Sequence, residues 1–349
     1  MKQLKYLLSL SLISLIVFFS SCSELGRQTP VWEAGGFTPN GKYYVYVYSI
    51  YNVTSYSSSG GATYRGGSTE NYFEVIDCST GRKILDGSLD FDERIDIVDM
   101  SNDYVWLRVH DPYKSEYSLA IFDLAAGKLA FTAKEIRKLN PDIPFGQGRV
   151  YQRAKGQEYA IYEAEDGRQY EVNPKSGKLS LVQHPASPLA INLESALAYD
   201  DGFFQGDHSM PGIKTLREGG SRERLMLESD SSVRSKLDFL DPSFLAYSTR
   251  SFGRDPVSLR YKNSFFVLSY TVRSDARDML LSRLDSQSLE SYWTVTLPEK
   301  ENDELSSYSN KARVFLAKKT LLLANQSYLM SIDLETGKIN ASQELLPGL

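Results

Sequence analysis

Cysteine and histidine are scarce in this chain of 349 residues, which contains 2 Cys and 3 His. Two cysteines exclude a disulfide-dense scaffold and a zinc ribbon. The histidines lie far apart and without metal-ligand spacing, so a histidine-based metal site is not expected. Basic residues form no block of five or more and the formal net charge is -5. This charge balance argues against nucleic-acid binding.

Catalytic motifs are absent as well. The sequence has no glycine-rich phosphate loop, and Asp207-His208-Ser209 is the one place where triad residue types are adjacent. A triad needs convergence in space rather than adjacency in sequence, so this run is not interpreted as catalytic. The acidic stretch Asp90–Asp96 lacks the Gly and the Glu of a Ca²⁺ loop and is interpreted as a solvated strand edge. We therefore expect no enzymatic activity, no cofactor and no metal.

The first residues have the pattern expected of an export signal. Lys2 and Lys5 precede an uncharged apolar run, Tyr6–Phe19, which is too short to span a membrane. The run ends at Ser20-Ser21-Cys22. This junction resembles the lipobox of bacterial lipoproteins, in which the Cys thiol is acylated, for example with palmitate, and the preceding peptide is removed. The alternative is an ordinary secretory signal in which the Cys occurs by chance.

The lipobox resemblance implies a division of the chain. Residues 1–21 are the signal peptide with its helix, 22–30 a tether, and 31–349 the folded domain. Cys22 is the lipidation site, and several acyl chains on it anchor a globule stably without spanning the membrane. Ser23 at the next position is compatible with the outer membrane, and the domain then faces the periplasm. The other cysteine, Cys78, is interpreted as a small turn residue.

A turn recurs along the rest of the chain, with the pattern apolar, Asp or Asn, two variable residues, small, Gly, basic. Its acidic or amide residues are Asp77, Asp123, Asn173, Asp285 and Asp333, and the copy at Asp285 lacks the Gly. The Asp or Asn side chain bonds backbone N–H groups ahead of it, and Gly takes a positive φ. Each copy therefore predicts a hairpin between two outer strands. The spacing is near 50 residues, and the long interval from Asn173 to Asp285 has room for a degenerate copy at Leu227–Ser232.

A second regularity follows each turn. Eight residues after the Asp or Asn stand Leu85, Phe131, Leu181, Trp293 and Ala341. This pattern resembles the tryptophan-docking repeat of quinoprotein-like β-propellers, in which an aromatic residue at that offset packs between neighbouring blades. The resemblance implies an all-β fold, a single β-propeller with four antiparallel strands per blade. The repeats predict six blades, or seven if Leu237–Thr249 forms its own blade. A β-sandwich, the alternative, has no superperiod of 50 residues.

Three segments depart from the repeat. Thr132 and Glu135 have capping-box spacing and predict a short helix near 133–139 that ends before Pro141. Thr54–Asn71 is predicted to be a long loop, and Asp201–Arg224 an irregular segment rich in aromatic and cationic residues. The last two segments supply the candidate binding rim, which consists of Tyr56, Tyr64, Arg65, Phe203, Phe204, His208, Arg217 and Arg222.

The predicted function is binding. A well-kept repeat without catalytic motifs favours a lipid-anchored, non-catalytic propeller that binds a protein partner or scaffolds an envelope complex. The chain resembles uncharacterised propeller lipoproteins of bacteria. It is also similar in anchor, fold and repeat to the propeller lipoprotein of the outer-membrane barrel assembly machinery. The alternative is a glycan-binding or glycan-active propeller lipoprotein, in which aromatic residues stack on sugar rings.

Overall fold

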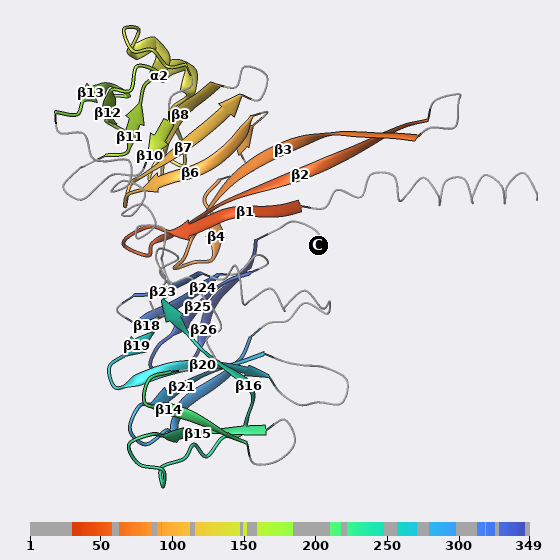
Figure 1. Ribbon diagram of the computed structural model, residues 1–349, viewed down its shortest axis with the longest axis vertical. Coiled ribbons are helices and arrows are strands. Elements are labelled where there is room, and N and C mark those ends of the chain that lie inside the picture. The colour runs from red at the N-terminus through yellow and green to blue at the C-terminus, as the bar shows by residue number, and fades with distance from the viewer. Residues whose placement is uncertain are drawn as a thin grey trace, which may run out of the picture.

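A computed structural model describes residues 30–57, 63–85, 89–91, 93–111, 116–146, 149–151, 159–183, 210–217, 222–247, 257–270, 279–297, 313–317, 319–324 and 328–345. The predicted signal peptide, Cys22 and most of the predicted tether lie outside the described residues. Within these ranges the chain is all-β, with one helix (Figure 1). No helix among the described residues is long and apolar enough to cross a membrane.

Three antiparallel sheets form in chain order from the first half of the chain. The first sheet has the order β1 (Pro30–Phe37), β2 (Tyr43–Ser57), β3 (Thr63–Asp77) and β4 (Arg82–Lys83), with β5 (Leu89–Phe91) also paired to β3. The second sheet has the order β6 (Arg94–Met100), β7 (Tyr104–Asp111), β8 (Glu116–Asp123) and β9 (Lys128–Phe131). The third sheet has the order β10 (Arg149–Tyr151), β11 (Ile161–Glu163), β12 (Gln169–Val172) and β13 (Leu179–Leu181). Each is the up-and-down meander expected of a propeller blade.

The second half forms a seven-stranded sheet and a last sheet. The seven-stranded sheet has the order β14 (Ile213–Arg217), β15 (Arg222–Leu227), β16 (Phe239–Phe244), β20 (Ser264–Tyr270), β21 (Met279–Asp285) and β22 (Ser291–Thr296), with β19 (Arg260–Tyr261) beside β20. The last sheet has the order β23 (Arg313–Leu316), β24 (Thr320–Ala324), β25 (Tyr328–Asp333) and β26 (Ile339–Glu344). β17 (Ala246–Tyr247) and β18 (Val257–Ser258) form a separate pair. The segment considered for a seventh blade, Leu237–Thr249, thus supplies β16 to the seven-stranded sheet and β17 to the separate pair.

The recurrent turns have the predicted geometry. In each copy Oδ1 of the Asp or Asn accepts hydrogen bonds from the backbone N–H groups two and three residues ahead, at 2.8–3.2 Å. The residue four places ahead has a positive φ in every copy: Gly81, Gly127, Gly177, Leu289 and Gly337. Each turn closes a hairpin between the two outer strands of its sheet. Leu289 adopts the left-handed conformation without being glycine.

Two of the residues at the docking offset, Trp293 and Phe131, contact the turn of the next sheet. Trp293 on β22 donates from Nε1 to the carbonyl of Leu334 at 2.9 Å, and a Cβ placed on Gly337 would lie 2.7 Å from its indole ring. Phe131 lies in the same way against Gly177 of the third sheet. The predicted packing of this position between neighbouring sheets is therefore confirmed at these two junctions.

The last sheet packs on the first through the same kind of contact, between a docking residue and the glycine of a turn. A Cβ on Gly81 would lie 3.1 Å from Cβ of Ala341, the docking residue of the last repeat. Tyr46 of β2 donates from its hydroxyl to the carbonyl of Leu345 at 2.6 Å. A buried apolar cluster of strands β2, β3, β24 and β25 surrounds this contact. Contact between the last and the first repeat is the connectivity that a propeller requires.

Further buried clusters join the first sheet to the second, the second to the third, and the seven-stranded sheet to the last. In Figure 1 the third sheet lies near one end of the molecule and β14 and β15 near the other, so the described sheets form an open series in this view. Leu181, the docking residue of the third sheet, is 55% exposed. The all-β architecture of blade-like sheets is confirmed, and the blade count and ring closure stay predictions.

The predicted helix is present as α2 (Ala133–Leu139). Thr132 is its N-cap, and the capping box with Glu135 is formed in both directions. Ile136 is buried against the second and third sheets. Asn140 ends the helix, and its side-chain amide donates to the carbonyl of Gly177 at 2.8 Å. The helix therefore bridges the second sheet to the turn of the third.

Candidate binding site

The first sheet carries a two-stranded extension. β2 and β3 pair without a break from Tyr43↔Asp77 to Ser57↔Thr63. β1 accompanies β2 only as far as Ile50, and β5 accompanies β3 only from Asn71 onward. The remaining residues, 51–57 and 63–70, form a ribbon that we call the arm. Figure 1 shows the arm projecting away from the sheets.

The arm corrects the prediction of a long loop over Thr54–Asn71. Ser, Gly and Thr in this segment suggested irregular structure, but all but five of its residues lie in the hairpin. Tyr and Thr residues occur in both strands and suit strand structure, and cross-strand pairing outweighs the presence of Gly. The hairpin places Tyr56 directly opposite Tyr64, and Arg65 opposite Ser55. Three of the predicted rim residues are therefore brought together by backbone register.

A polar and aromatic network fixes the base of the arm. Glu70 accepts from Nδ2 of Asn52 at 2.9 Å and from the hydroxyl of Tyr72 at 2.6 Å. The ring of Tyr72 stacks on Tyr48 with centroids 5.0 Å apart. Tyr48 continues a row of stacked rings into the buried core of the first sheet. The arm is thus anchored in the sheet at its base.

Apolar side chains are exposed at the same base. Tyr51 is 46% and Val31 48% exposed. Val31 pairs with Ser49, two residues from Tyr51 on β2, so the two side chains are diagonal neighbours. A Cβ on Gly67 would lie 2.5 Å from Cζ of Tyr51. Glycine at 67 therefore leaves room for the Tyr51 ring to lie across the opposite strand.

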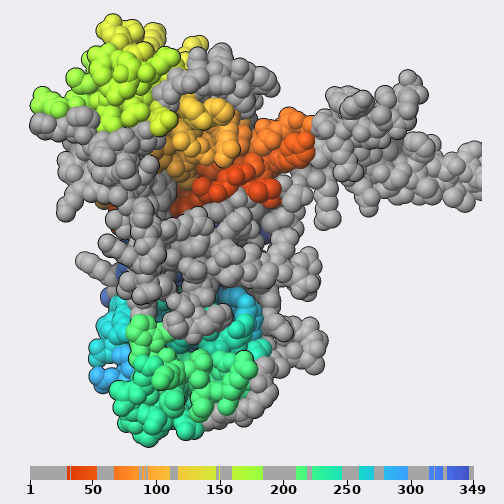
Figure 2. All heavy atoms as spheres, viewed as in Figure 1, coloured from red at the N-terminus to blue at the C-terminus, as the bar shows by residue number. Residues whose placement is uncertain are grey.

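The other half of the predicted rim was expected to lie in an irregular segment, but two of its residues lie in a hairpin. Arg217 and Arg222 lie on the hairpin of β14 and β15. Both side chains are exposed. Arg217 lies 3.2 Å from Glu223 and Arg222 lies 3.9 Å from Asp238. Ion pairs on the surface contribute little to stability. In Figure 2 the green surface of these strands lies at the lower end of the molecule, apart from the red and orange surface of the first sheet. Phe203, Phe204 and His208 lie outside the described residues.

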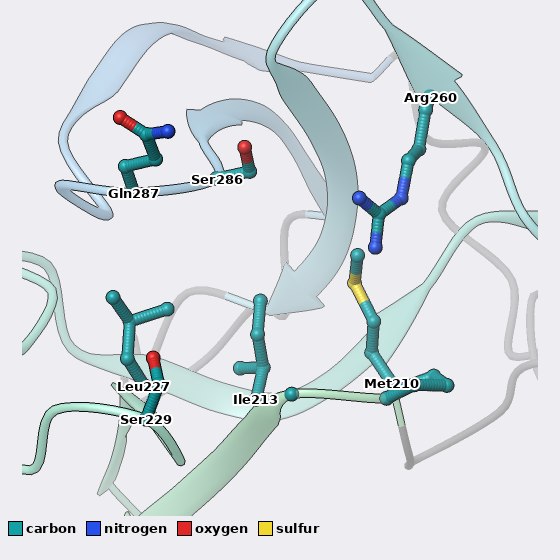
Figure 3. Close-up of a pocket in the computed structure, with 9 residues that line it drawn as sticks. Met210, Ile213, Leu227, Ser229, Arg260, Ser286 and Gln287 are labelled. Atoms are coloured by element: carbon teal, nitrogen blue, oxygen red, sulfur yellow. The ribbon is translucent and has the colours of Figure 1, made fainter.

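A hollow of about 420 Å³ lies between the β14–β15 hairpin and the turn after β21. Figure 3 shows Met210, Ile213 and Leu227 on one side, and Ser286, Gln287 and Arg260 on the other. Arg260 is the only charged residue of the lining, and none of the lining residues is a carboxylate, histidine or cysteine. The described residues of the lining therefore include no acid–base pair.

A buried arginine joins the seven-stranded sheet to the last sheet. Arg283 is 3% exposed, and it donates to Oγ of Ser264 at 2.7 Å and to the carbonyl of Leu334 at 2.6 Å. Its guanidinium lies 4.9 Å from the ring centre of Tyr261 and 4.4 Å from that of Tyr292. Hydrogen bonds and two aromatic faces compensate the buried charge. We interpret this group as an inter-sheet clamp.

Glu335 completes the clamp at the surface. Its carboxylate accepts from Nζ of Lys262 at 2.5 Å and from the hydroxyl of Tyr261 at 2.9 Å. These bonds, that of Lys262 foremost, lower the pKa of Glu335 to about 2. Lys262 and Arg283 both pair with Glu335, and the second carboxylate of the group, Asp285, accepts from the hydroxyl of Tyr292 at 2.8 Å. An internally bonded set suits a structural role better than ligand binding.

Metal and thiol chemistry find no support in the described part of the chain. It contains no cluster of three or more His, Cys, Asp or Glu residues that could hold a metal ion. His110 stacks on Tyr117 with centroids 4.5 Å apart. Cys78 is buried in the turn of the first sheet, as predicted for a small turn residue. Burial raises the pKa of its thiol well above the ordinary value, which disfavours the nucleophilic thiolate.

Comparison with known proteins places the chain in no family. No family model matches it, and no curated protein does. Among solved structures, AztD from Citrobacter koseri is 10% identical, with 88% of this chain and 85% of that chain covered and a TM-score of 0.23. The quinohemoprotein alcohol dehydrogenase from Comamonas testosteroni is 8% identical, with 90% and 68% covered and a TM-score of 0.23. Similarities this weak carry no argument about function, and the fold rests on the sheets described above.

Proposed function

We propose that this protein is a lipid-anchored, non-catalytic propeller of the bacterial cell envelope that binds a protein partner through its arm. The arm is the observation that supports this function. A two-stranded ribbon in water is at best marginally stable by itself, and nothing in the described core requires residues 51–57 and 63–70 to extend beyond the first sheet. A partner that covers the ribbon would supply the missing contacts.

The chemistry of the described residues supports binding over catalysis. The hollow lacks acid–base groups, the charged clamp is internally satisfied, and Cys78 is buried. The arm instead offers backbone groups and exposed apolar side chains at its base. Anchoring through Cys22 would hold this surface close to the membrane, where envelope complexes assemble.

Removal of the arm tests the proposal. Residues 51–69 are replaced by Asn-Gly, which suits a two-residue turn between the paired residues Ile50 and Glu70. The matched control is Arg217→Ala with Arg222→Ala, which changes the other half of the predicted rim. We expect wild type and control to co-purify with the same partner from detergent-solubilised envelopes, and the arm deletion to lose it. Recovery of the wild type as a lone monomer in repeated trials would refute partner binding.

The anchor is tested separately. Cys22→Ala should abolish incorporation of radiolabelled palmitate and release the protein from the membrane fraction, while the sheets still form. Labelling that persists in the Cys22→Ala protein would overturn the assignment of the lipidation site.

A further inference from the structure

The outward side of β3 can be assigned from its hydrogen bonds. The carbonyl of Val75 accepts from the N–H of Ile84 on the β4 side at 3.0 Å, so Val75 directs its backbone groups away from β2. Just before β2, the carbonyl of Lys42 accepts from the N–H of Cys78 on the β3 side, and the carbonyl of Tyr43, the first residue of β2, accepts from the N–H of Thr38 on the β1 side. The direction alternates along an antiparallel strand. Odd-numbered residues of β3 therefore direct N–H and C=O outward, and even-numbered residues bond β2.

Alternation continues into the arm because the pairing of β2 with β3 shows no register shift. Arg65, Gly67 and Thr69 thus direct their backbone groups to the outer edge. β5 occupies this edge only alongside residues 71–73, and no described strand lies beside residues 63–70. Residues 67–70 are exposed. The edge consequently presents a row of backbone donors and acceptors. This row continues the line of β5, which is already paired with β3.

This edge lacks the usual protection against strand pairing. Natural sheets protect exposed edges with proline, lysine, bulges or very short strands. Residues 63–70 contain no proline and no lysine, run without a bulge, and carry one charge of each sign, Arg65 and Glu70. A formally neutral edge matches an uncharged strand better than an acidic or basic one. An edge left in this state suits strand addition by another chain.

We propose that the protein partner adds an uncharged, extended segment as a third strand of the arm, antiparallel to β3 along residues 63–69 and in line with β5. This inference rests on the proposed function and names the mode of recognition. The main chain of Arg65, Gly67 and Thr69 forms the bonds, and a partner segment of about seven residues spans the edge.

Proline substitution tests the main-chain bonds directly. Thr69→Pro removes one outward N–H and leaves the bonds to β2 intact, because proline is tolerated where the N–H of an edge strand faces outward. Thr69→Ala removes the same side chain but keeps the N–H. A photoreactive benzoylphenylalanine at position 65 of the full-length, anchored protein reports contact in living cells, and mass spectrometry locates the cross-linked residues. Arg65→Pro, probed from position 69, is the second proline variant, and circular dichroism checks that each variant folds.

We expect cross-links from positions 65 and 69 to one segment of one partner, spaced about four residues apart. Thr69→Pro and Arg65→Pro should reduce their yield at least tenfold, and Thr69→Ala should preserve it. Equal yields from Thr69→Pro and Thr69→Ala would overturn strand addition, as would cross-links only to a second copy of this chain. A partner that co-purifies without cross-links to this edge would overturn the inference and leave the proposed function standing. No partner in either assay would refute both.

Discussion

Gly337→Ala tests whether the docking contact between sheets is as tight as the structure indicates. Gly337 has φ +73°, where an alanine costs about 1–2 kcal/mol from backbone strain. Its added Cβ would lie 2.7 Å from Cγ and Cδ2 of Trp293, well inside the carbon–carbon optimum of about 3.5–4.0 Å. Overpacking of a well-filled site costs about 1–3 kcal/mol more. We therefore expect a loss of about 2–5 kcal/mol in the free energy of unfolding.

Two matched glycines isolate the steric part of this loss. Gly127 occupies the same position of its turn with φ +63°, and its added Cβ would meet one atom, the carbonyl oxygen of Ile84, at 3.6 Å. Gly167 has φ +79° and nothing within 4 Å of an added Cβ. Alanine at either position should cost only the backbone strain of about 1–2 kcal/mol. The difference between Gly337→Ala and these controls is the contribution of the Trp293 contact.

The measurement is guanidinium unfolding followed by far-ultraviolet circular dichroism, for the three variants and for Gly337→Ala combined with Trp293→Ala. Compared with Trp293→Ala alone, which serves as its reference, the combined variant lacks the indole at the outset, so alanine at 337 should cost only the backbone strain. Equal losses for Gly337→Ala and Gly127→Ala would refute the tight docking contact. An extra cost that survives removal of Trp293 would do the same.

Three further outcomes are expected. Leu289→Gly relieves a positive φ worth about 1–2 kcal/mol but deletes a buried side chain worth about 2–5 kcal/mol, so unfolding experiments should show net destabilisation; a more stable variant would contradict this packing. Glu335, with its pKa lowered to about 2, contributes stability that is present above its ordinary pKa of 4.5 and is lost as the pH falls toward 2. Glu335→Gln should therefore be less stable than wild type at neutral pH, with the two melting curves converging near pH 2; a difference independent of pH would exclude the charge as its cause. In a Cys22→Ser background, the thiol of Cys78 should resist a thiol reagent until the protein is unfolded, and rapid reaction in the native state would contradict its burial.

Local chemistry explains which sequence predictions were confirmed. The Asx turns, their positive-φ residues and the capping box of α2 depend on contacts within a few residues, so the motif and its geometry coincide. The docking position could also be predicted, because it lies a fixed eight residues after the Asp or Asn of the turn. Leu85, Leu181 and Ala341 are not aromatic, however, so at these positions the residue type by itself did not indicate docking.

The candidate site was predicted less well because it depends on pairing between distant residues. Composition suggested a loop where β2 and β3 form the arm, since glycine and serine weaken a strand signal that cross-strand pairing restores. The same error affected Arg217 and Arg222, which lie in the hairpin of β14 and β15. The alternation of Tyr and Val over residues 44–48 predicted the start of β2, but it ends before the arm begins at Tyr51.

The sequence by itself determined the repeat, the turn that closes each outer hairpin and the position that packs on the next sheet, because these follow from side chains bonding to their own neighbouring backbone. Only the tertiary structure decided that the last repeat packs on the first and that β16 pairs with β20. It also decided that β2 and β3 extend beyond the strands beside them. Those features depend on which strands lie side by side. Strand pairing buries surface between residues far apart in the chain, and no local pattern specifies its extent.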